Sequence, residues 1–250
     1  MIEARDIRAG YGDRPDILHE ISFEVHAGEI VAILGARGCG KSALIKAVAG
    51  LLELRGGAIE IDGENVTAIA TGNKSRHRRV SYVPQTDMVV GALTVMENLM
   101  LRSRPLNWKL RAQRLDSVFG LFPHLADKRR QTASDLLDGD RRVLLLCLAL
   151  MAGPRILLLD EPLAGLSPLM MRDILDAIVR IRNEAAITVL MVEKNALGAL
   201  SVADRAYVMT NGQMAVTASA QDLLNDPAME WHNFGDAPKA DDAGAGPAVR

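Results

Sequence analysis

The chain has 250 residues, of which 49% are hydrophobic and 24% are charged, a balance typical of a folded protein that buries a sizeable core. Its 29 Lys and Arg residues against 31 Asp and Glu leave a formal net charge of -2, and only 4% of the residues are aromatic. Proteins that bind nucleic acids usually need a basic surface or a set of stacking rings, so this composition argues against a nucleic-acid partner.

The apolar segments and the cysteines narrow the cellular setting. No apolar run approaches the roughly 18 residues that are needed to cross a bilayer. The first residues have neither the basic start nor the apolar stretch of a secretory signal. Cys39 and Cys147 are too few for a disulfide framework or a metal motif. We therefore expect a cytoplasmic protein without a membrane span of its own, linked to a membrane only through a partner.

The first part of the chain predicts strands around one glycine-rich loop. Residues 1–28 alternate apolar and polar positions, which is typical of short strands, here joined by a turn at 10–15. The apolar run Ile30–Leu34 predicts a buried strand, and the glycine-rich loop after it leads into a helix predicted over 41–51. Residues 58–61 lie between Gly-Gly and Asp-Gly pairs and predict another strand.

The glycine-rich loop carries a phosphate-binding motif. It matches the pattern G-x-x-x-x-G-K-[ST] at every fixed position, with Gly35, Ala36, Arg37, Gly38, Cys39, Gly40, Lys41 and Ser42. Glycines let main-chain N–H groups turn toward phosphate oxygens, and the N-terminus of a helix adds partial positive charge. We expect Lys41 to reach the outer phosphates and the Ser42 hydroxyl to ligate Mg²⁺. A chance glycine-rich turn is the alternative, and the strand before and helix after the loop argue against it.

The middle of the chain is predicted to be mostly helical. A basic exposed turn at 76–79 precedes a strand predicted at 80–83. Apolar residues then follow a helical spacing that is interrupted at Pro105 and Pro123. We place a helical subdomain at about 86–145.

The last part of the chain returns to alternating strands and helices. Apolar runs predict strands at 156–159 and 187–192. One face of the helix between them is apolar, formed by Met171, Ile174, Leu175, Ile178 and Ile181. This alternation predicts an α/β fold with a parallel sheet covered on both faces. We expect a single domain over 1–234, followed by an Ala/Gly/Asp/Pro-rich disordered tail at 235–250.

Two acidic residues end the strand predicted at 156–159. Asp160 and Glu161 stand at its carboxyl end, the edge at which open parallel sheets bind ligands. We expect Asp160 to hold Mg²⁺ and Glu161 to activate the attacking water as a general base. Two acids after an apolar strand are common as a structural turn, and the phosphate loop earlier in the chain favours the catalytic interpretation.

With these motifs, the chain resembles the ATP-binding-cassette transporter ATPases over essentially residues 1–234. The resemblance implies a P-loop NTPase core with ATP and Mg²⁺ as cofactors, an N-terminal antiparallel β subdomain, and an α-helical subdomain that faces membrane permease subunits. The stretches Val192-Glu193-Lys194-Asn195 and 203–208 most resemble the branched-chain amino acid and urea import branch of that family.

The resemblance assigns further residues to the site. Tyr11 falls where the family stacks an aromatic ring on adenine, and Gln85 falls where a glutamine touches magnesium and the attacking water. Lys194 stands where many relatives have histidine, and it offers a cation to the terminal phosphate but transfers protons less readily than imidazole at neutral pH. Ala43 replaces a second hydroxyl beside the phosphates. The structural alternatives are a half-buried loop tyrosine and a solvated glutamine.

The signature sequence of the family, LSGGQ or LSGGE, is degenerate here. Residues 136–140, the signature segment, read Leu-Leu-Asp-Gly-Asp, and Gly139 keeps the second glycine. The resemblance implies that this segment clasps the terminal phosphate of ATP on the opposite subunit. Leu137 lacks the hydroxyl donor, a loss of ~3 kcal/mol or 10² to 10³ in rate. Asp138 adds a carboxylate whose repulsion at ~5 Å costs roughly 3 kcal/mol at an effective dielectric of about 20. Ser167 also replaces the usual aspartate of the dimer-contact loop.

Three functions are compatible with this sequence. We expect an ATP-hydrolysing subunit on the cytoplasmic face of the inner (plasma) membrane that powers amino acid or amide import through separate permease subunits. Because the signature is degenerate, we expect its partner to be a second ABC ATPase with an intact signature. A catalytically weak, nucleotide-binding regulatory subunit of such a heterodimer is the alternative. A soluble ABC-type ATPase of translation or DNA repair is disfavoured, because those proteins usually carry two cassettes or long coiled-coil insertions.

Overall fold

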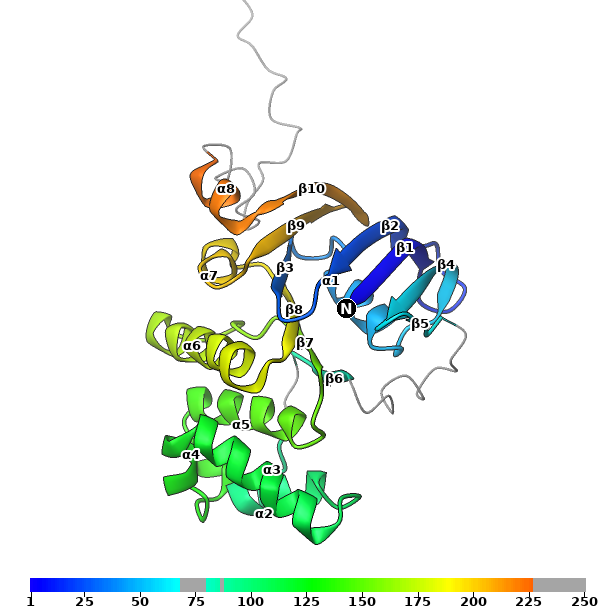
Figure 1. Ribbon diagram of the computed structural model, residues 1–250. Helices are drawn as coiled ribbons and strands as arrows, with labels where there is room; N and C mark the ends of the chain where they lie inside the picture. Colours follow the sequence, from blue (N-terminus) through cyan, green and yellow to red (C-terminus); the bar gives the residue numbers. More distant parts are fainter. Residues whose placement is uncertain (68–79, 86–87, 227–250) are drawn as a thin grey trace, which may run out of the picture.

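Two β-sheets form the framework of the computed structural model, which describes residues 1–67, 80–85 and 88–226. The smaller sheet is antiparallel, with strand order β2 (Leu18–Val25), β1 (Ile2–Ala9), β4 (Leu54–Ile61) and β5 (Glu64–Asn65). The larger sheet has the order β10 (Gln213–Ser219), β9 (Arg205–Thr210), β3 (Ile30–Leu34), β8 (Thr188–Glu193), β7 (Ile156–Asp160) and β6 (Val80–Val83). Its neighbouring strands are parallel except for the antiparallel pair β9 and β10. The predicted antiparallel β part and parallel sheet are both present (Figure 1).

The central strands of the larger sheet are buried on both faces. In β3, Ile30, Ala32 and Leu34 pack into one hydrophobic core, while Val31 and Ile33 pack into a second. All five side chains are fully buried. Because alternate residues of a strand point to opposite faces, a strand between two cores contains only apolar residues. The uninterrupted apolar run in the sequence therefore corresponds to a strand covered on both sides.

Helices cover the two faces of the larger sheet. One face contacts α1 (Lys41–Val48), which lies between the two sheets (Figure 1). The other face is covered by α5 (Asp138–Leu150), α6 (Pro168–Ala185), α7 (Ala196–Leu200) and α8 (Ala220–Asn225). The predicted face of α6 packs inward: Ile174, Leu175, Ile178 and Ile181 are buried and Met171 is half-buried. The α/β fold predicted from the sequence is confirmed.

A group of helices packs at the end of the molecule away from the antiparallel sheet (Figure 1). It comprises α2 (Val95–Arg102), α3 (Trp108–Leu121), α4 (Pro123–Asp127) and a 3₁₀ turn (Ala133–Asp135), and it leads into α5. Thr94 and Glu97 form a capping box at the start of α2, and Pro123 begins α4 at a position where its missing N–H costs nothing. These helices lie in the predicted helical part, although α5 continues past residue 145 to Leu150. Residues 86 and 87 lie outside the described residues.

Several boundaries differ from the sequence prediction. Helix α1 ends at Val48 and not near Leu51, because Gly50 adopts a left-handed conformation (φ 71°) and the N–H of Leu51 donates to the Lys46 carbonyl. Strand β4 begins at Leu54 and therefore precedes the predicted range 58–61. Strands β9 and β10 and helices α7 and α8 were not predicted, since each is short and only partly apolar.

Some sequence predictions cannot be placed. The turn predicted at 76–79, the end of the domain at 234 and the tail predicted at 235–250 lie outside the described residues. Within the described ranges, no helix combines the length and the apolar character required to cross a bilayer.

Candidate functional site

Most of the predicted site residues line one cleft of about 380 Å³ at the carboxyl ends of the parallel strands. Its lining comprises Tyr11, Ile17, Arg37, Gly38, Gly40, Lys41, Ser42, Ala43, Gln85, Glu161 and Lys194. They come from the segments that follow β1, β3, β6, β7 and β8. Because parallel strands end at the same edge of a sheet, their separate loops converge there.

The loop between β3 and α1 has the glycine geometry that a phosphate cradle requires. Gly38 and Gly40 have positive φ angles of 85° and 109°, which only glycine adopts readily. A Cβ on Gly35 would lie 2.5 Å from both Cys39 Sγ and the Met209 carbonyl oxygen, so a side chain is excluded. Gly40 directly precedes α1, and the N-terminus of this helix opens into the cleft. Partial positive charge at that end favours an anion.

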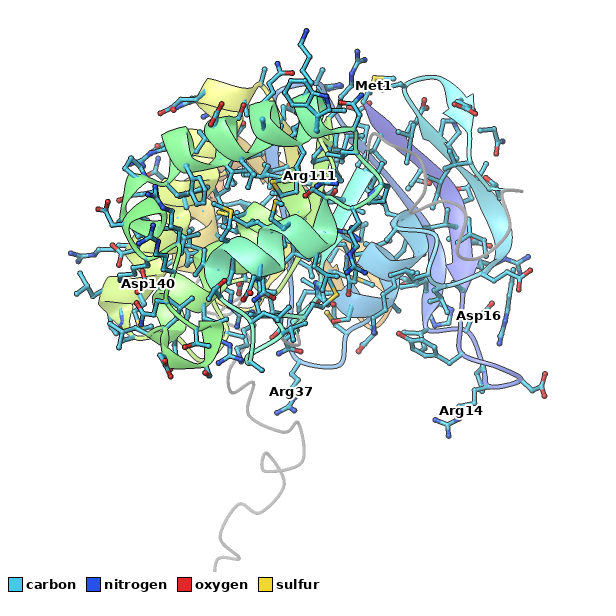
Figure 2. All side chains as sticks on the ribbon, turned by 90° about the horizontal axis from the view of Figure 1, so that it is seen from below. Met1, Arg14, Asp16, Arg37, Arg111 and Asp140 are labelled. Carbon is cyan, nitrogen blue, oxygen red and sulfur yellow. The ribbon has the colours of Figure 1, made fainter. Side chains whose placement is uncertain are left out.

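Lys41 lies folded across the phosphate loop. Its side chain is only 3% exposed, and its ammonium donates to the Gly35 carbonyl at 2.7 Å and the Ala36 carbonyl at 2.9 Å. These carbonyls partly compensate the buried charge, and phosphate oxygens are stronger partners for the same ammonium. Arg37, in contrast, is exposed and projects away from the loop (Figure 2).

Cys39 belongs to the buried side of the loop and does not line the cleft. It is 8% exposed, and its sulfur lies 3.9 Å from Lys41 Nζ. Gly35 and Ala36 do not line the cleft either, and their carbonyls accept from the Lys41 ammonium.

Asp160 is held by two hydroxyl groups. Its Oδ1 accepts from Ser42 Oγ at 2.9 Å, and its Oδ2 accepts from the Tyr82 hydroxyl at 2.9 Å. Burial raises the pKa of the Tyr82 phenol far above its ordinary value, and the Asp160 charge raises it further, so Tyr82 remains a donor. Sequence reasoning missed Tyr82, because an isolated aromatic residue in a strand is usually part of the core.

The donor set at Ser42 and Asp160 fits Mg²⁺. Among the described residues, no three His, Cys, Asp or Glu side chains are grouped as an all-protein metal site. Mg²⁺ does not need one, because it commonly binds one or two protein oxygens together with water and substrate phosphates. A hydroxyl and a carboxylate in contact, beside the phosphate loop, meet that requirement.

Glu161 and Gln85 meet across the cleft. Gln85 Nε2 donates to Glu161 Oε2 at 3.1 Å. Glu161 has a left-handed backbone (φ 48°), and its N–H donates to the Val192 carbonyl at 3.0 Å. Such a conformation is unfavourable for a non-glycine residue and is found where surrounding structure enforces it, often at functional sites. Here it turns the carboxylate into the cleft, next to the predicted metal site.

The end of β8 buries Glu193, its last residue, and places the next residue, Lys194, at the cleft. Lys194 is exposed, whereas Glu193 is fully buried. The Glu193 carboxylate accepts from the N–H groups of Leu163, Lys194 and Asn195. Burial raises the pKa of the Glu193 carboxyl above its ordinary value and the charge of Glu161 adds to this, while the three N–H donors act in the opposite direction. Sequence reasoning quoted Glu193 only within a motif and gave it no role.

Tyr11 lies at the outer edge of the cleft. It is 41% exposed, and the Lys46 ammonium stands 5.9 Å from the centroid of its ring. An exposed ring on a loop is available for stacking, as predicted for adenine.

The signature segment lies away from this cleft. Leu137 is the N-cap of α5, makes no side-chain cap hydrogen bond and is 73% exposed. Asp138 is exposed and begins the helix, whereas Asp140 bonds to Lys128. Gly139 borders a separate cavity of about 620 Å³ between α5 and α6, and Figure 2 shows Asp140 far from Arg37 of the phosphate loop. Within one chain, the predicted phosphate ligand Gly139 therefore does not join the other site residues.

The sequence matches the model of the ABC transporter family over residues 18–164. The High-affinity branched-chain amino acid transport ATP-binding protein BraG of Pseudomonas aeruginosa is 36% identical, over 91% of this chain and 96% of that protein. The Probable branched-chain amino acid transport ATP-binding protein LivF of Archaeoglobus fulgidus is 32% identical, over 92% and 97%. The Lipopolysaccharide export system ATP-binding protein LptB of Haemophilus influenzae is 32% identical, over 90% and 93%.

Solved structures agree with the fold. An ATP binding subunit of an ABC transporter is 26% identical, with a TM-score of 0.73 over 95% of both chains. The ADP conformation of an ATP-binding cassette has a TM-score of 0.82 at 22% identity, over 94% of this chain and 99% of that chain. The second likeness concerns the fold alone.

Proposed function

This chain belongs to the ABC transporter family as an ATP-binding subunit, and from this membership we propose that it hydrolyses ATP to power the import of an amino acid or amide. The solute passes through separate permease subunits, and the chain acts at the cytoplasmic face of the membrane. The observation that carries the proposal is the convergence of Lys41, Ser42 and Glu161 in one cleft.

Each residue has a defined task in this proposal. Main-chain N–H groups of the phosphate loop and the Lys41 ammonium bind the outer phosphates of ATP. Ser42 and Asp160 would hold Mg²⁺ with Gln85 beside it, and the bound ion would supply positive charge to the phosphates. Glu161 accepts a proton from the attacking water, which Gln85 orients through the contact between the two side chains.

Lys194 and Tyr11 complete the nucleotide site. The exposed Lys194 ammonium faces the cleft and stabilises negative charge on the terminal phosphate. The Tyr11 ring, with Lys46 beside it, stacks on adenine at the outer edge.

The solute class is supported by relatives. Two proteins similar to this chain over nine tenths of its length carry names of branched-chain amino acid transport. A relative named for lipopolysaccharide export is almost as similar, so the direction of transport needs a direct test.

The test uses the assembled transporter. The chain is reconstituted in liposomes with the permeases and the solute-binding protein that co-purify with it, and uptake of labelled leucine, isoleucine, valine and urea is measured with Mg-ATP on the cassette side. We expect uptake that requires ATP and is lost in Lys41→Ala. If Lys41→Ala transports normally and the purified chain has no affinity for Mg-ATP, the proposed function is wrong.

A second candidate follows from the signature segment. Leu137 offers no hydroxyl and Asp138 presents an exposed carboxylate at the start of α5, so this surface is unfavourable for binding phosphate. We propose that the chain pairs with a second ABC ATPase whose intact signature completes the site on Lys41. The partner's own nucleotide then meets the degenerate segment, and that second site turns over slowly.

The heterodimer is tested by mixing the two cassettes. We expect low ATP turnover by this chain alone and a rise when the second cassette is added. Cooperative turnover by the homodimer would remove the need for a partner. If the mixture hydrolyses ATP equally well with Glu161→Gln in this chain, the chain is instead a regulatory subunit that binds nucleotide without catalysis.

A further inference from the structure

One buried carboxylate connects two of the loops that form the nucleotide cleft. Glu193 Oε1 accepts from the N–H of Leu163 at 2.7 Å. Its Oε2 accepts from the N–H of Lys194 at 3.0 Å and of Asn195 at 3.3 Å. The first donor belongs to the turn after β7 and the other two belong to the turn after β8, so each carboxylate oxygen serves one loop.

This connection is not explained by an ion pair. Glu193 is fully buried, and among the described residues no Lys or Arg side chain forms a salt bridge with it. A carboxylate without a cation is costly to bury, and the cost is offset only when hydrogen bonds satisfy its oxygens. An apolar residue of similar size would fit a purely structural core position better, which indicates that the carboxylate serves its N–H donors.

The two connected loops carry groups that face the terminal phosphate in the proposed function. Leu163 lies two residues after Glu161, and Lys194 directly follows Glu193. A further bond, from the N–H of Glu161 to the Val192 carbonyl at 3.0 Å, joins the turn after β7 to strand β8 itself. The turn after β7 also continues into the loop that ends at Ser167, the N-cap of α6. Glu193 therefore fixes the separation between Glu161 and Lys194.

We propose that Glu193 is a positioning residue that holds the turns after β7 and β8 as one unit, so that Glu161 and Lys194 keep a single arrangement around the terminal phosphate. The inference rests on the proposed function, because it concerns the same site. It predicts that loosening Glu193 impairs hydrolysis more than nucleotide binding, since binding depends mainly on the phosphate loop and α1.

The decisive variant is Glu193→Gln. A glutamine has the shape of glutamate, but only one of its two end atoms accepts hydrogen bonds, so it can serve one turn and not both. We expect kcat for ATP in the assembled complex to fall by about 10- to 100-fold, with the Kd for Mg-ATP changed less than about twofold. Glu193→Asp keeps two acceptor oxygens on a shorter side chain and should recover part of the lost activity.

Hydrogen exchange of individual amides gives a readout that does not depend on activity. In Glu193→Gln the N–H of Leu163, or those of Lys194 and Asn195, should exchange faster than in the unaltered chain. Glu29→Gln is the matched control, because Glu29 also accepts a main-chain N–H, from His26 at 2.8 Å, but lies at the opposite end of the sheet. It should leave kcat and the three amides unchanged.

The outcomes separate the inference from the proposed function. Unchanged kcat and unchanged exchange in Glu193→Gln would overturn the positioning role. An equal loss of nucleotide binding and kcat, in both Glu193→Gln and Glu193→Asp, would assign Glu193 to general folding and would also overturn it. If the unaltered complex does not hydrolyse ATP at all, the proposed function is wrong, while the amide exchange still decides whether Glu193 joins the two turns.

Discussion

The phosphate loop and the signature segment both precede a helix and are both proposed to meet phosphate, yet here they differ sharply. Ahead of α1, two glycines, a buried lysine and a serine line a cleft, and Ser42 already contacts Asp160. Ahead of α5, an exposed leucine stands at the N-cap and an acidic residue opens the helix. Both positions have the same backbone dipole, so the side chains decide whether phosphate is attracted or repelled.

This difference indicates that the phosphate loop and the signature segment serve different nucleotide sites. In the proposed dimer, the phosphate loop acts on the nucleotide of this chain, whereas the signature segment acts on the nucleotide of the partner. A chain can therefore lose one function and keep the other. Lys41, Asp160 and Glu161 each form hydrogen bonds within the site. This is expected if only the signature segment has lost its phosphate-binding role.

The largest effect is expected from Glu161→Gln in the complex with the second cassette. The amide keeps the contact with Gln85 but cannot accept the proton of water, so ATP turnover should fall by about 10² to 10⁴-fold. Nucleotide affinity should be unchanged or tighter, as measured by fluorescence of a labelled ATP analogue. A loss below about threefold would show that this cleft is not the main hydrolytic site. The phosphate loop of this chain would then not be the competent half of the comparison with the signature segment.

Repair of the signature segment should have the next largest effect. Leu137→Ser with Asp138→Gly restores a hydroxyl donor and removes the repelling charge, so turnover by the chain alone should rise by about 10² to 10³-fold. The measurement is phosphate release as a function of protein concentration, because the gain depends on dimer formation. If repair changes nothing, the segment does not face nucleotide and the proposed heterodimer loses its basis.

Tyr82→Phe tests the site beside the phosphate loop by removing a single hydrogen bond. The variant removes only the hydroxyl that donates to Asp160 Oδ2, and it leaves the Ser42 contact in place. Because Asp160 loses one of the two hydroxyl donors that orient its carboxylate, it should hold Mg²⁺ in the nucleotide complex about tenfold less tightly. This is the usual effect of losing an outer hydrogen bond to a metal ligand. The Mg²⁺ dependence of hydrolysis measures this shift. Equal Mg²⁺ midpoints for the two proteins would mean that Tyr82 only packs between β6 and β7.

The sequence predicted the elements whose signals are local. The strand Ile30–Leu34, the loop after it and the acids after β7 follow from an apolar run, a spaced motif and a strand end. It also indicated that the signature segment is degenerate, since a missing hydroxyl and an added charge are visible without coordinates. These predictions required no knowledge of which strands are neighbours.

What the sequence left out depends on contacts between distant segments. Tyr82 and Asp160 are 78 residues apart, and Glu193 and Leu163 are 30 residues apart. Only the parallel pairing of β6 with β7 and of β7 with β8 brings them together. Likewise, the end of α1 at Val48 depends on the left-handed conformation of Gly50, which spacing of apolar residues does not reveal.

The smallest effect is expected from Asp140→Asn, a matched counterpart of Asp138→Asn within the signature segment. The Asp140 carboxylate is 12% exposed, pairs with Lys128 and lies 3.7 Å from His124, so its charge is already compensated. Asp138 is exposed at the first position of α5, and among the described residues no ion pair to its carboxylate is formed. Removing the Asp138 charge should raise turnover of the chain alone by about 10²-fold, whereas Asp140→Asn should change it less than about twofold.

Asp140→Asn should act on stability instead. It loses an ion pair and a favourable charge in the first turn of α5, which together are worth about 0.5 to 1.5 kcal/mol. Urea unfolding of both variants, measured beside the turnover assay, separates the two kinds of effect. If Asp140→Asn raises turnover as much as Asp138→Asn, the nucleotide of the partner responds to the total charge of the first turn of α5. The replacement of the signature glycine by Asp138 would then not be the specific cause of slow turnover at the site that the signature segment faces.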